Sequence, residues 1–177
     1  MANLKDSPRF QIYDDYYTPK SAWEQINHLI PKDKTVWEAF MFNSTLSKSK
    51  SNLIELNNKV VGETDWDFFD KCENLEYDLI ISNPPFNKEV KIPILKKLVE
   101  LDKPFIIIMN SMNIYANYFN DIFKNGRKDL QIIIPKGKIH FEKLLENGTT
   151  ELKSNTSFYC VYVAYKMNIP NEKLFLD

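Results

Sequence analysis

The fold is decided by residues 77–86, which read Tyr-Asp-Leu-Ile-Ile-Ser-Asn-Pro-Pro-Phe. The apolar run from Leu79 to Ile81 has the length and residue types of a strand that is buried on both faces. Two prolines follow almost at once. Because proline lacks a backbone N–H and fixes φ, the strand has to end at Asn83. The stretch therefore predicts a buried strand that places an Asn-Pro-Pro-Phe turn at one edge of a sheet.

Helical and strand patterns alternate on both sides of this stretch. Apolar residues at helical spacing predict helices at 19–30, 45–56, 93–102 and 114–123. Short β-rich runs predict further strands at 35–40, 59–61, 103–109, 130–134 and 158–165. The last two strands are expected to form an antiparallel pair at the edge. This order predicts an α/β fold: a doubly wound, mostly parallel, Rossmann-like sheet with an antiparallel last strand.

Prolines and a glycine are expected to mark the helix ends. Thr18 and Pro19 have the order of an N-cap followed by a first helical residue. Pro93 likewise stands where a helix is expected to begin. Gly126 is expected just past the end of a helix, as its C′ residue.

The composition fits a single domain over residues 1–177. A chain of this length with 44% hydrophobic residues can bury one sizeable core. No apolar run is long enough to span a bilayer, and the first residues lack an apolar signal region, which favours a soluble cytoplasmic protein without membrane contact. The cysteines Cys72 and Cys160 lie far apart, and the histidines His28 and His140 have no partner at metal-ligand spacing, so no metal site is expected.

The charge is distributed unevenly along the chain. Residues 1–86 carry 9 Lys and Arg against 14 Asp and Glu, whereas residues 87–177 carry 14 against 10. The second part therefore has a net charge of +4 in a chain whose total is −1. Such an excess is compatible with a face that contacts phosphates, and lysines scattered over solvated faces give the same count.

The Asn-Pro-Pro-Phe turn has the chemistry to hold a ring-conjugated amine. The lone pair of such an amine is delocalised, which makes the nitrogen a poor nucleophile. The side-chain carbonyl of Asn83 and the backbone carbonyl of Pro84 can accept hydrogen bonds from the NH2 group and favour a more tetrahedral nitrogen. Pro84 and Pro85 fix the backbone in advance, and Phe86 offers a ring on which an extruded base can stack.

A buried strand followed by Asn83-Pro84-Pro85-Phe86 resembles the S-adenosylmethionine-dependent adenine-N6 (amino) methyltransferases, in a compact form like those of phages and viruses. The resemblance implies S-adenosylmethionine as cofactor and a catalytic site formed by these four residues. It also implies cofactor contacts by Tyr17, Thr18 and Pro19, against the methionine part, and by Glu38 and Phe40 of the first-strand segment.

Further acidic and aromatic residues carry over from the same family. Asp67 resembles the acid that accepts a hydrogen bond from the cofactor's adenine, and Phe68 resembles the aromatic that packs on its ring. Glu63 or Asp65 is implied at the ribose hydroxyls. A solvated turn explains these acids equally simply.

The family's closing hairpin supplies an aromatic for the other face of the target base, and Phe141 stands at the matching position. Core packing is the alternative for this ring. Lys136 and Lys138 are implied at the phosphates of a nucleic acid. The chain departs from the family after the first strand, where Phe42 and Ser44 replace the glycines of Gly-x-Gly.

The resemblance implies transfer of a methyl group to the N6 amine of adenine in DNA. RNA adenine and a protein glutamine amide present a similar NH2 and stay open as substrates. An alternative function also stays open: an inactive methyltransferase-fold subunit that binds nucleic acid or a partner. No segment is expected to form a separate target-recognition domain, which leaves loose specificity, recognition through short loops or a specificity subunit.

Overall fold

The computed structural model describes residues 16–41, 48–63, 67–144, 150–152 and 158–177. Its main sheet has six strands in the order β3-β2-β4-β5-β9-β6. Their bounds are Thr35–Trp37 (β2), Lys59–Val61 (β3), Leu79–Ser82 (β4), Phe105–Asn110 (β5), Leu130–Ile133 (β6) and Cys160–Tyr165 (β9). Strands β3, β2, β4 and β5 pair in parallel, and β9 is antiparallel to both of its neighbours. The mostly parallel α/β sheet predicted from the sequence is confirmed.

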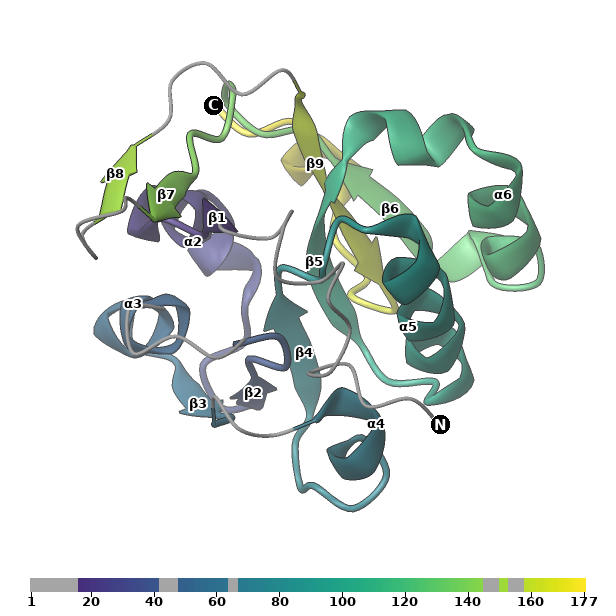
Figure 1. Cartoon of the computed structure of the whole chain (residues 1–177), viewed down its shortest axis with the longest axis horizontal. Helices are drawn as coiled ribbons and strands as arrows, with labels where there is room; N and C mark the ends of the chain where they lie inside the picture. Colours follow the sequence, from purple (N-terminus) through teal and green to yellow (C-terminus); the bar gives the residue numbers. More distant parts are fainter. Residues whose placement is uncertain (1–15, 42–47, 64–66, 145–149, 153–157) are drawn as a thin grey trace.

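The expectation that the last two strands form an antiparallel pair at the edge is confirmed, because β6 pairs with β9 in antiparallel orientation. The strand β9 lies between β5 and β6, so it is internal, and β6 forms the edge (Figure 1). All six residues of β9 are buried, because the strand is paired on both sides and covered on both faces. Segment 174–176 adds a short bridge to Ile134, just beyond β6.

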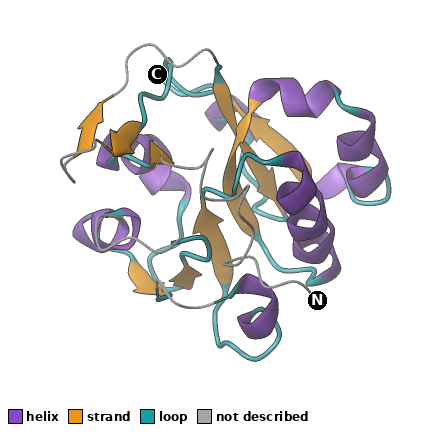
Figure 2. Ribbon diagram, in the orientation of Figure 1, coloured by secondary structure: helices purple, strands orange, loops and turns teal. Residues whose placement is uncertain are grey.

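Helices cover both faces of the sheet (Figure 2). They are α2 (Lys20–Ile26), α3 (Ser49–Glu55), α4 (Phe68–Lys71), α5 (Lys88–Glu100) and α6 (Asn117–Phe123). Alternate residues of β5 belong to two separate core clusters, because successive side chains of a strand point to opposite faces. Phe105 and Ile107 pack with residues of α4, α5 and α6, whereas Ile106 packs with residues of α2 and α3. The doubly wound arrangement is therefore present.

Short segments complete the fold. Single 3₁₀ turns lie at Asn27–Leu29 (η2), Ser111–Tyr115 (η3), Arg127–Asp129 (η4) and Asn171–Lys173 (η5). A second, small sheet joins β1 (Tyr16–Tyr17), β7 (Glu142–Leu144) and β8 (Thr150–Leu152). Tyr17 pairs with Glu142, which places the chain before α2 beside the segment after β6. Of these elements, η2 lies within the helix predicted at 19–30, and η3 overlaps the start of the helix predicted at 114–123. The others were not predicted, since two or three residues give no readable period.

Three predicted helix ends need correction. Pro19 is the N-cap of α2, not its first helical residue, and Thr18 precedes the cap. Helix α5 begins at Lys88 because the Asn87 side chain accepts a hydrogen bond from Glu89 N at 2.9 Å. Pro93 consequently lies inside that helix.

Gly126 has a φ of −110°, so it is not a left-handed cap. A Cβ there would lie 2.7 Å from the hydroxyl oxygen of Tyr165, so close approach to this ring explains the glycine.

The longest described helix, α5, has 13 residues, and none of the described helices has the length and apolar character needed to cross a membrane.

Candidate functional site

The candidate site lies where the parallel strands end, between β2 and β4. The chain passes from β2 to β3 on one side and later places β4 and β5 on the other (Figure 1). In open α/β sheets this reversal of strand order opens a crevice at the carboxyl ends of the strands, where ligands bind. The segment 38–41 follows β2 at this edge, and the Asn-Pro-Pro-Phe turn follows β4.

Asn83 carries a buried acceptor without a donor. Its side-chain oxygen Oδ1 is shielded from solvent, yet it has no hydrogen-bond partner among the described residues. Leaving such a group unpaired costs about 1–3 kcal/mol, so buried polar atoms are rarely left this way without a functional reason. The next residues, Pro84 and Pro85, have no N–H to offer it. No described residue therefore uses the accepting capacity of Asn83 Oδ1.

Ser82 and Glu38 connect the ends of the two strands. The Ser82 hydroxyl donates to the Glu38 carboxylate, and Phe40 N donates to Ser82 Oγ at 3.1 Å. Both side chains are buried, with 0% of Ser82 and 3% of Glu38 exposed. We call the turn Asn83–Phe86 the acceptor turn. Ser82 directly precedes Asn83, so these bonds hold the start of the acceptor turn against the loop after β2.

The Glu38 carboxyl group also joins a helix to this network. It interacts with the Ser49 hydroxyl at the start of α3, and that hydroxyl accepts a hydrogen bond from Trp23 Nε1 at 3.0 Å. Burial raises the pKa of Glu38, and the hydrogen bonds from Ser49, Ser82 and Phe40 N only partly oppose this effect. Glu38 was predicted to contact the cofactor; in this structure its carboxyl group links the loop after β2 to Ser82 and Ser49.

The raised pKa of Glu38 predicts a pH-dependent stability. A folded-state pKa above the ordinary value of 4.5 means that the folded state retains the proton longer than the unfolded state. The chain should then lose stability as pH rises from 4.5 towards the folded-state pKa. We expect the thermal midpoint of Glu38→Gln to depend less on pH across this window than that of the parent. Equal slopes for the two proteins would contradict a buried carboxyl with a raised pKa.

Two aromatics predicted at the cofactor lie in the core. Phe40 is 6% exposed and Phe68 is 1% exposed, and their ring centroids are 5.0 Å apart. Phe68 also stacks on Trp37 at 5.6 Å. The prediction that Phe68 packs on a cofactor ring is corrected to a core role, because its faces are occupied by neighbouring aromatics. Phe69, the next residue, is only partly buried.

The predicted acids have different environments. Glu63 follows β3 at the carboxyl edge, is 57% exposed and pairs with Lys50 at 3.0 Å. Asp67 caps α4, because its Oδ1 accepts a hydrogen bond from Phe69 N at 2.9 Å. Asp65 lies outside the described residues, as do Phe42 and Ser44 of the departing loop.

The segment before α2 lies on the same side as the hairpin region. Thr18 is buried and Tyr17 is partly exposed. Pro19 is also buried and turns the chain into α2. Pairing of Tyr17 with Glu142 brings this segment next to Phe141, so two predicted ligand-binding segments meet.

Phe86 and Phe141 also meet, but without space between them. Their ring centroids are 5.9 Å apart in an edge-to-face contact, and Phe158 contacts both rings at 5.3 and 5.9 Å. A base stacked between two rings needs two contact distances of about 3.5 Å each. Phe141 is fully buried, so its predicted place on the second face of a base is corrected to support behind Phe86, which is only partly buried.

The two predicted phosphate contacts lie in the segment after β6. The backbone N of Lys136 donates to Gln25 Oε1 of α2 at 2.9 Å. Lys136 is an exposed residue. Lys138 Nζ lies 5.2 Å from the ring centroid of Tyr159, which is 65% exposed. Strand β6 runs in the same direction as β4, because β9 between β5 and β6 is antiparallel to both. Both lysines therefore lie after the carboxyl end of β6, at the same edge of the sheet as the end of β4.

Sequence reasoning missed Ser82, Ser49 and Lys91. Ser82 had a readable signal, since it is a polar residue at the end of an otherwise apolar strand. Lys91 is 4% exposed, and its ammonium donates to the Phe86 carbonyl at 3.1 Å. Its burial could not be read from the sequence, because the start of α5 was misplaced.

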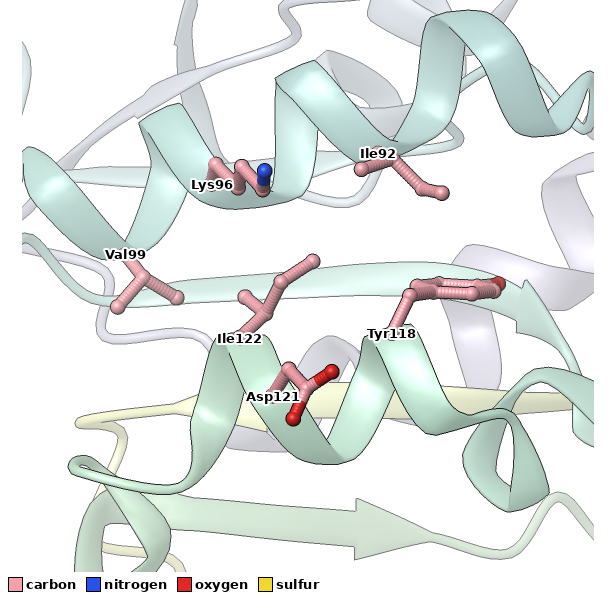
Figure 3. Close-up of a pocket in the computed structure, with 6 residues that line it drawn as sticks. All are labelled: Ile92, Lys96, Val99, Tyr118, Asp121 and Ile122. Atoms are coloured by element: carbon pink, nitrogen blue, oxygen red, sulfur yellow. The ribbon is translucent and has the colours of Figure 1, made fainter.

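A groove of about 440 Å³ lies between α5 and α6. Its lining includes Ile92, Tyr118 and Ile122, with Lys96 and Asp121 on facing helices (Figure 3). None of its lining residues belongs to the predicted site. The described residues contain no group of three His, Cys, Asp or Glu arranged to hold a metal ion.

No protein-family model matches the chain, and no curated protein matches it. The chain is similar to solved structures, among them an S-adenosylmethionine-dependent O-methyltransferase from Thermotoga maritima, with 8% identity, a TM-score of 0.40 and coverage of 82% of this chain and 64% of that one. TrmN from Thermus thermophilus has 11% identity and a TM-score of 0.42, and the match covers 83% of this chain and 48% of TrmN. Precorrin-6y C5,15-methyltransferase from Geobacter metallireducens has 9% identity and a TM-score of 0.41, and the match covers 90% of this chain and 100% of that one. The chain thus spans less than two thirds of the first two.

Proposed function

We propose that this chain transfers a methyl group from S-adenosylmethionine to the exocyclic N6 amine of adenine in DNA. The observation that carries the proposal is the buried, unpartnered Oδ1 of Asn83 at the carboxyl edge of the sheet. An amine is a suitable partner for this atom, because it supplies N–H donors and can leave its lone pair free on another side.

The acceptor turn contributes orientation. Asn83 Oδ1 and the Pro84 carbonyl would accept the two amine protons, which favours a tetrahedral nitrogen whose lone pair points away from the turn. The bond network of Ser82 and Glu38 holds the base of the turn before substrate arrives. Fixed acceptors of this kind need no reorganisation during the reaction. Phe86, supported by Phe141 and Phe158, would stack on the base.

S-adenosylmethionine would supply an electrophilic methyl group at this edge. Glu63, with much of its side chain exposed after β3, would hold the ribose hydroxyls, with Asp65 as the alternative acid. Asp67 and the Tyr17–Pro19 segment would flank the adenine and methionine ends. Glu38 and Phe40 are both buried, so they would support the cofactor site from inside the fold.

Other functions fit parts of the same site. RNA adenine and a protein glutamine amide offer the same NH2 group; a Phe at position 86, instead of Tyr, favours DNA. Lys136 and Lys138 lie after β6, where they would meet the phosphates of a nucleic acid. An inactive binding subunit is favoured by the replacement of both glycines by Phe42 and Ser44. A specificity subunit would supply target recognition in either case.

Calorimetric titration with S-adenosylmethionine separates an enzyme from an inactive subunit. We expect a dissociation constant below about 1 mM, within the usual range for enzyme substrates. Glu63→Gln should weaken binding by about tenfold, since one hydrogen bond to a charged acceptor contributes about 1.5 kcal/mol. Glu76→Gln is the matched control, because Glu76 is exposed and precedes β4 at the opposite edge. Absence of binding at millimolar cofactor would contradict the proposed enzyme.

A further inference from the structure

Helix α5 places a buried ammonium group directly behind the acceptor turn. Lys91 is 4% exposed, and its Nζ lies 3.1 Å from the backbone oxygen of Phe86 and 2.9 Å from Asn113 Oδ1. Phe86 is the last residue of the turn after β4. Asn113 belongs to η3, the segment that follows β5. One side chain therefore joins the segments that follow two neighbouring strands.

Asn113 is itself held by its neighbours. Its amide Nδ2 donates to the Asn110 carbonyl at 2.7 Å, and the Tyr118 hydroxyl donates to its Oδ1. Asn110 is the last residue of β5, and Tyr118 belongs to α6. The ammonium of Lys91 thus connects the acceptor turn to a part of the structure that is fixed from two sides.

Burying an ammonium group is costly, and an apolar side chain of similar length would fill the same volume at lower cost. Hydrogen bonds to a backbone carbonyl and an amide oxygen offset part of this cost. The arrangement is understandable if the orientation of the Phe86 carbonyl matters, because a methionine at position 91 could not hold it. The same bond constrains the Phe86–Asn87 peptide at the end of the turn.

We infer that Lys91 is a positioning residue of the acceptor site. Its ammonium fixes the Phe86 carbonyl and so holds Asn83, Pro84 and the Phe86 ring in the geometry that receives the amine. Lys91 touches neither the amine nor the methyl donor in this account; it acts through the turn. The inference rests on the proposed function, because the turn is there assigned to the substrate amine.

The first test compares Lys91→Met with Lys96→Met. Lys96 is an exposed lysine of the same helix and serves as the matched control. Misplacing a reacting group by about 1 Å can cost about 10²-fold in rate, so we expect kcat of Lys91→Met to fall by about that factor. The dissociation constant for S-adenosylmethionine should stay unchanged. A merely structural lysine would instead lower the melting temperature and leave kcat per folded molecule within threefold, which would overturn the inference.

The second test does not depend on methyl transfer. Labelling with carbonyl-¹³C phenylalanine and ¹⁵N asparagine selects the three Phe–Asn peptide bonds of the chain, at 42–43, 86–87 and 119–120. Loss of the hydrogen bond from Lys91 should move the carbonyl signal of the 86–87 bond to lower chemical shift, because hydrogen bonding deshields a carbonyl carbon. An unmoved 86–87 signal in folded Lys91→Met would overturn the positioning role.

Asn113→Ala provides a second variant if Lys91→Met fails to fold. It removes the partner that holds the ammonium from the side of β5. We expect a loss of about tenfold in kcat and a displaced 86–87 signal; no change in either would overturn the inference. A parent chain that transfers no methyl group, combined with a displaced signal, would overturn the proposed function and leave Lys91 as the group that fixes the turn.

Discussion

Replacing Asn83 with alanine is expected to lower the rate of methyl transfer by about 10²–10³-fold, as loss of one preorganised hydrogen-bonding group does in other enzymes. The side-chain oxygen is lost, and with it the acceptor that orients the amine. Loss of this oxygen should not by itself lower the stability, because Oδ1 has no hydrogen-bond partner among the described residues. Single-turnover rates and thermal melting of the same samples would measure the two effects.

Asn83→Asp is the matched comparison for this variant. The carboxyl group has nearly the same shape and keeps an oxygen at the position of Oδ1, so we expect much more transfer than in Asn83→Ala. An alanine variant that retains its rate within threefold would contradict the role given to Asn83. Parallel loss of rate and melting temperature in Asn83→Ala would show a structural role instead.

Replacing Gly62 with alanine is expected to destabilise the fold by about 3 kcal/mol or more. Gly62 follows β3 with a φ of +132°, a conformation that other residues avoid. An added Cβ would also overlap the backbone oxygen of Glu38, whose own N–H donates to Val61 O at 3.0 Å. Relief of the clash would therefore separate the ends of β2 and β3. Urea unfolding of the variant measures this loss.

Gly137→Ala is the control for the glycine prediction. A Cβ at this position meets nothing within 4 Å, so we expect a change of no more than about 0.5 kcal/mol. Equal stability of Gly62→Ala and Gly137→Ala would contradict the close approach of Gly62 to Glu38.

Most of the sheet could be predicted because its strands are short, continuous apolar runs. Leu79–Ser82 and Phe105–Asn110 are buried on both faces, and such strands are readable from composition alone. The position of β9 inside the sheet could not be read, since pairing order depends on contacts between distant segments. The start of α5 was missed because Pro93 is a stronger local signal than Asn87, although the Asn87 side chain provides the cap.

The candidate site could be predicted in part. The Asn-Pro-Pro-Phe turn was placed at a strand end by local chemistry, and the structure adds the unpartnered oxygen of Asn83. For the other predicted site residues, the burial of the side chain decides the outcome, and burial could not be predicted. Phe68 and Phe141 are core aromatics, and nothing in their sequence context distinguishes a core ring from a stacking ring. Lys91 shows the opposite error, because a lysine on a helix is read as solvated until its partners are known.

Methyl transfer is the most direct test of the role proposed for Asn83. The parent chain and Asn83→Ala would each be incubated with S-adenosylmethionine that carries a labelled methyl group and with unmethylated DNA, RNA and peptides that contain glutamine. Mass spectrometry of the digested products would then locate the label. We expect labelled N6-methyladenine from DNA with the parent chain and little or none with Asn83→Ala. Absence of label from every amine substrate, or equal label with both proteins, would contradict this role.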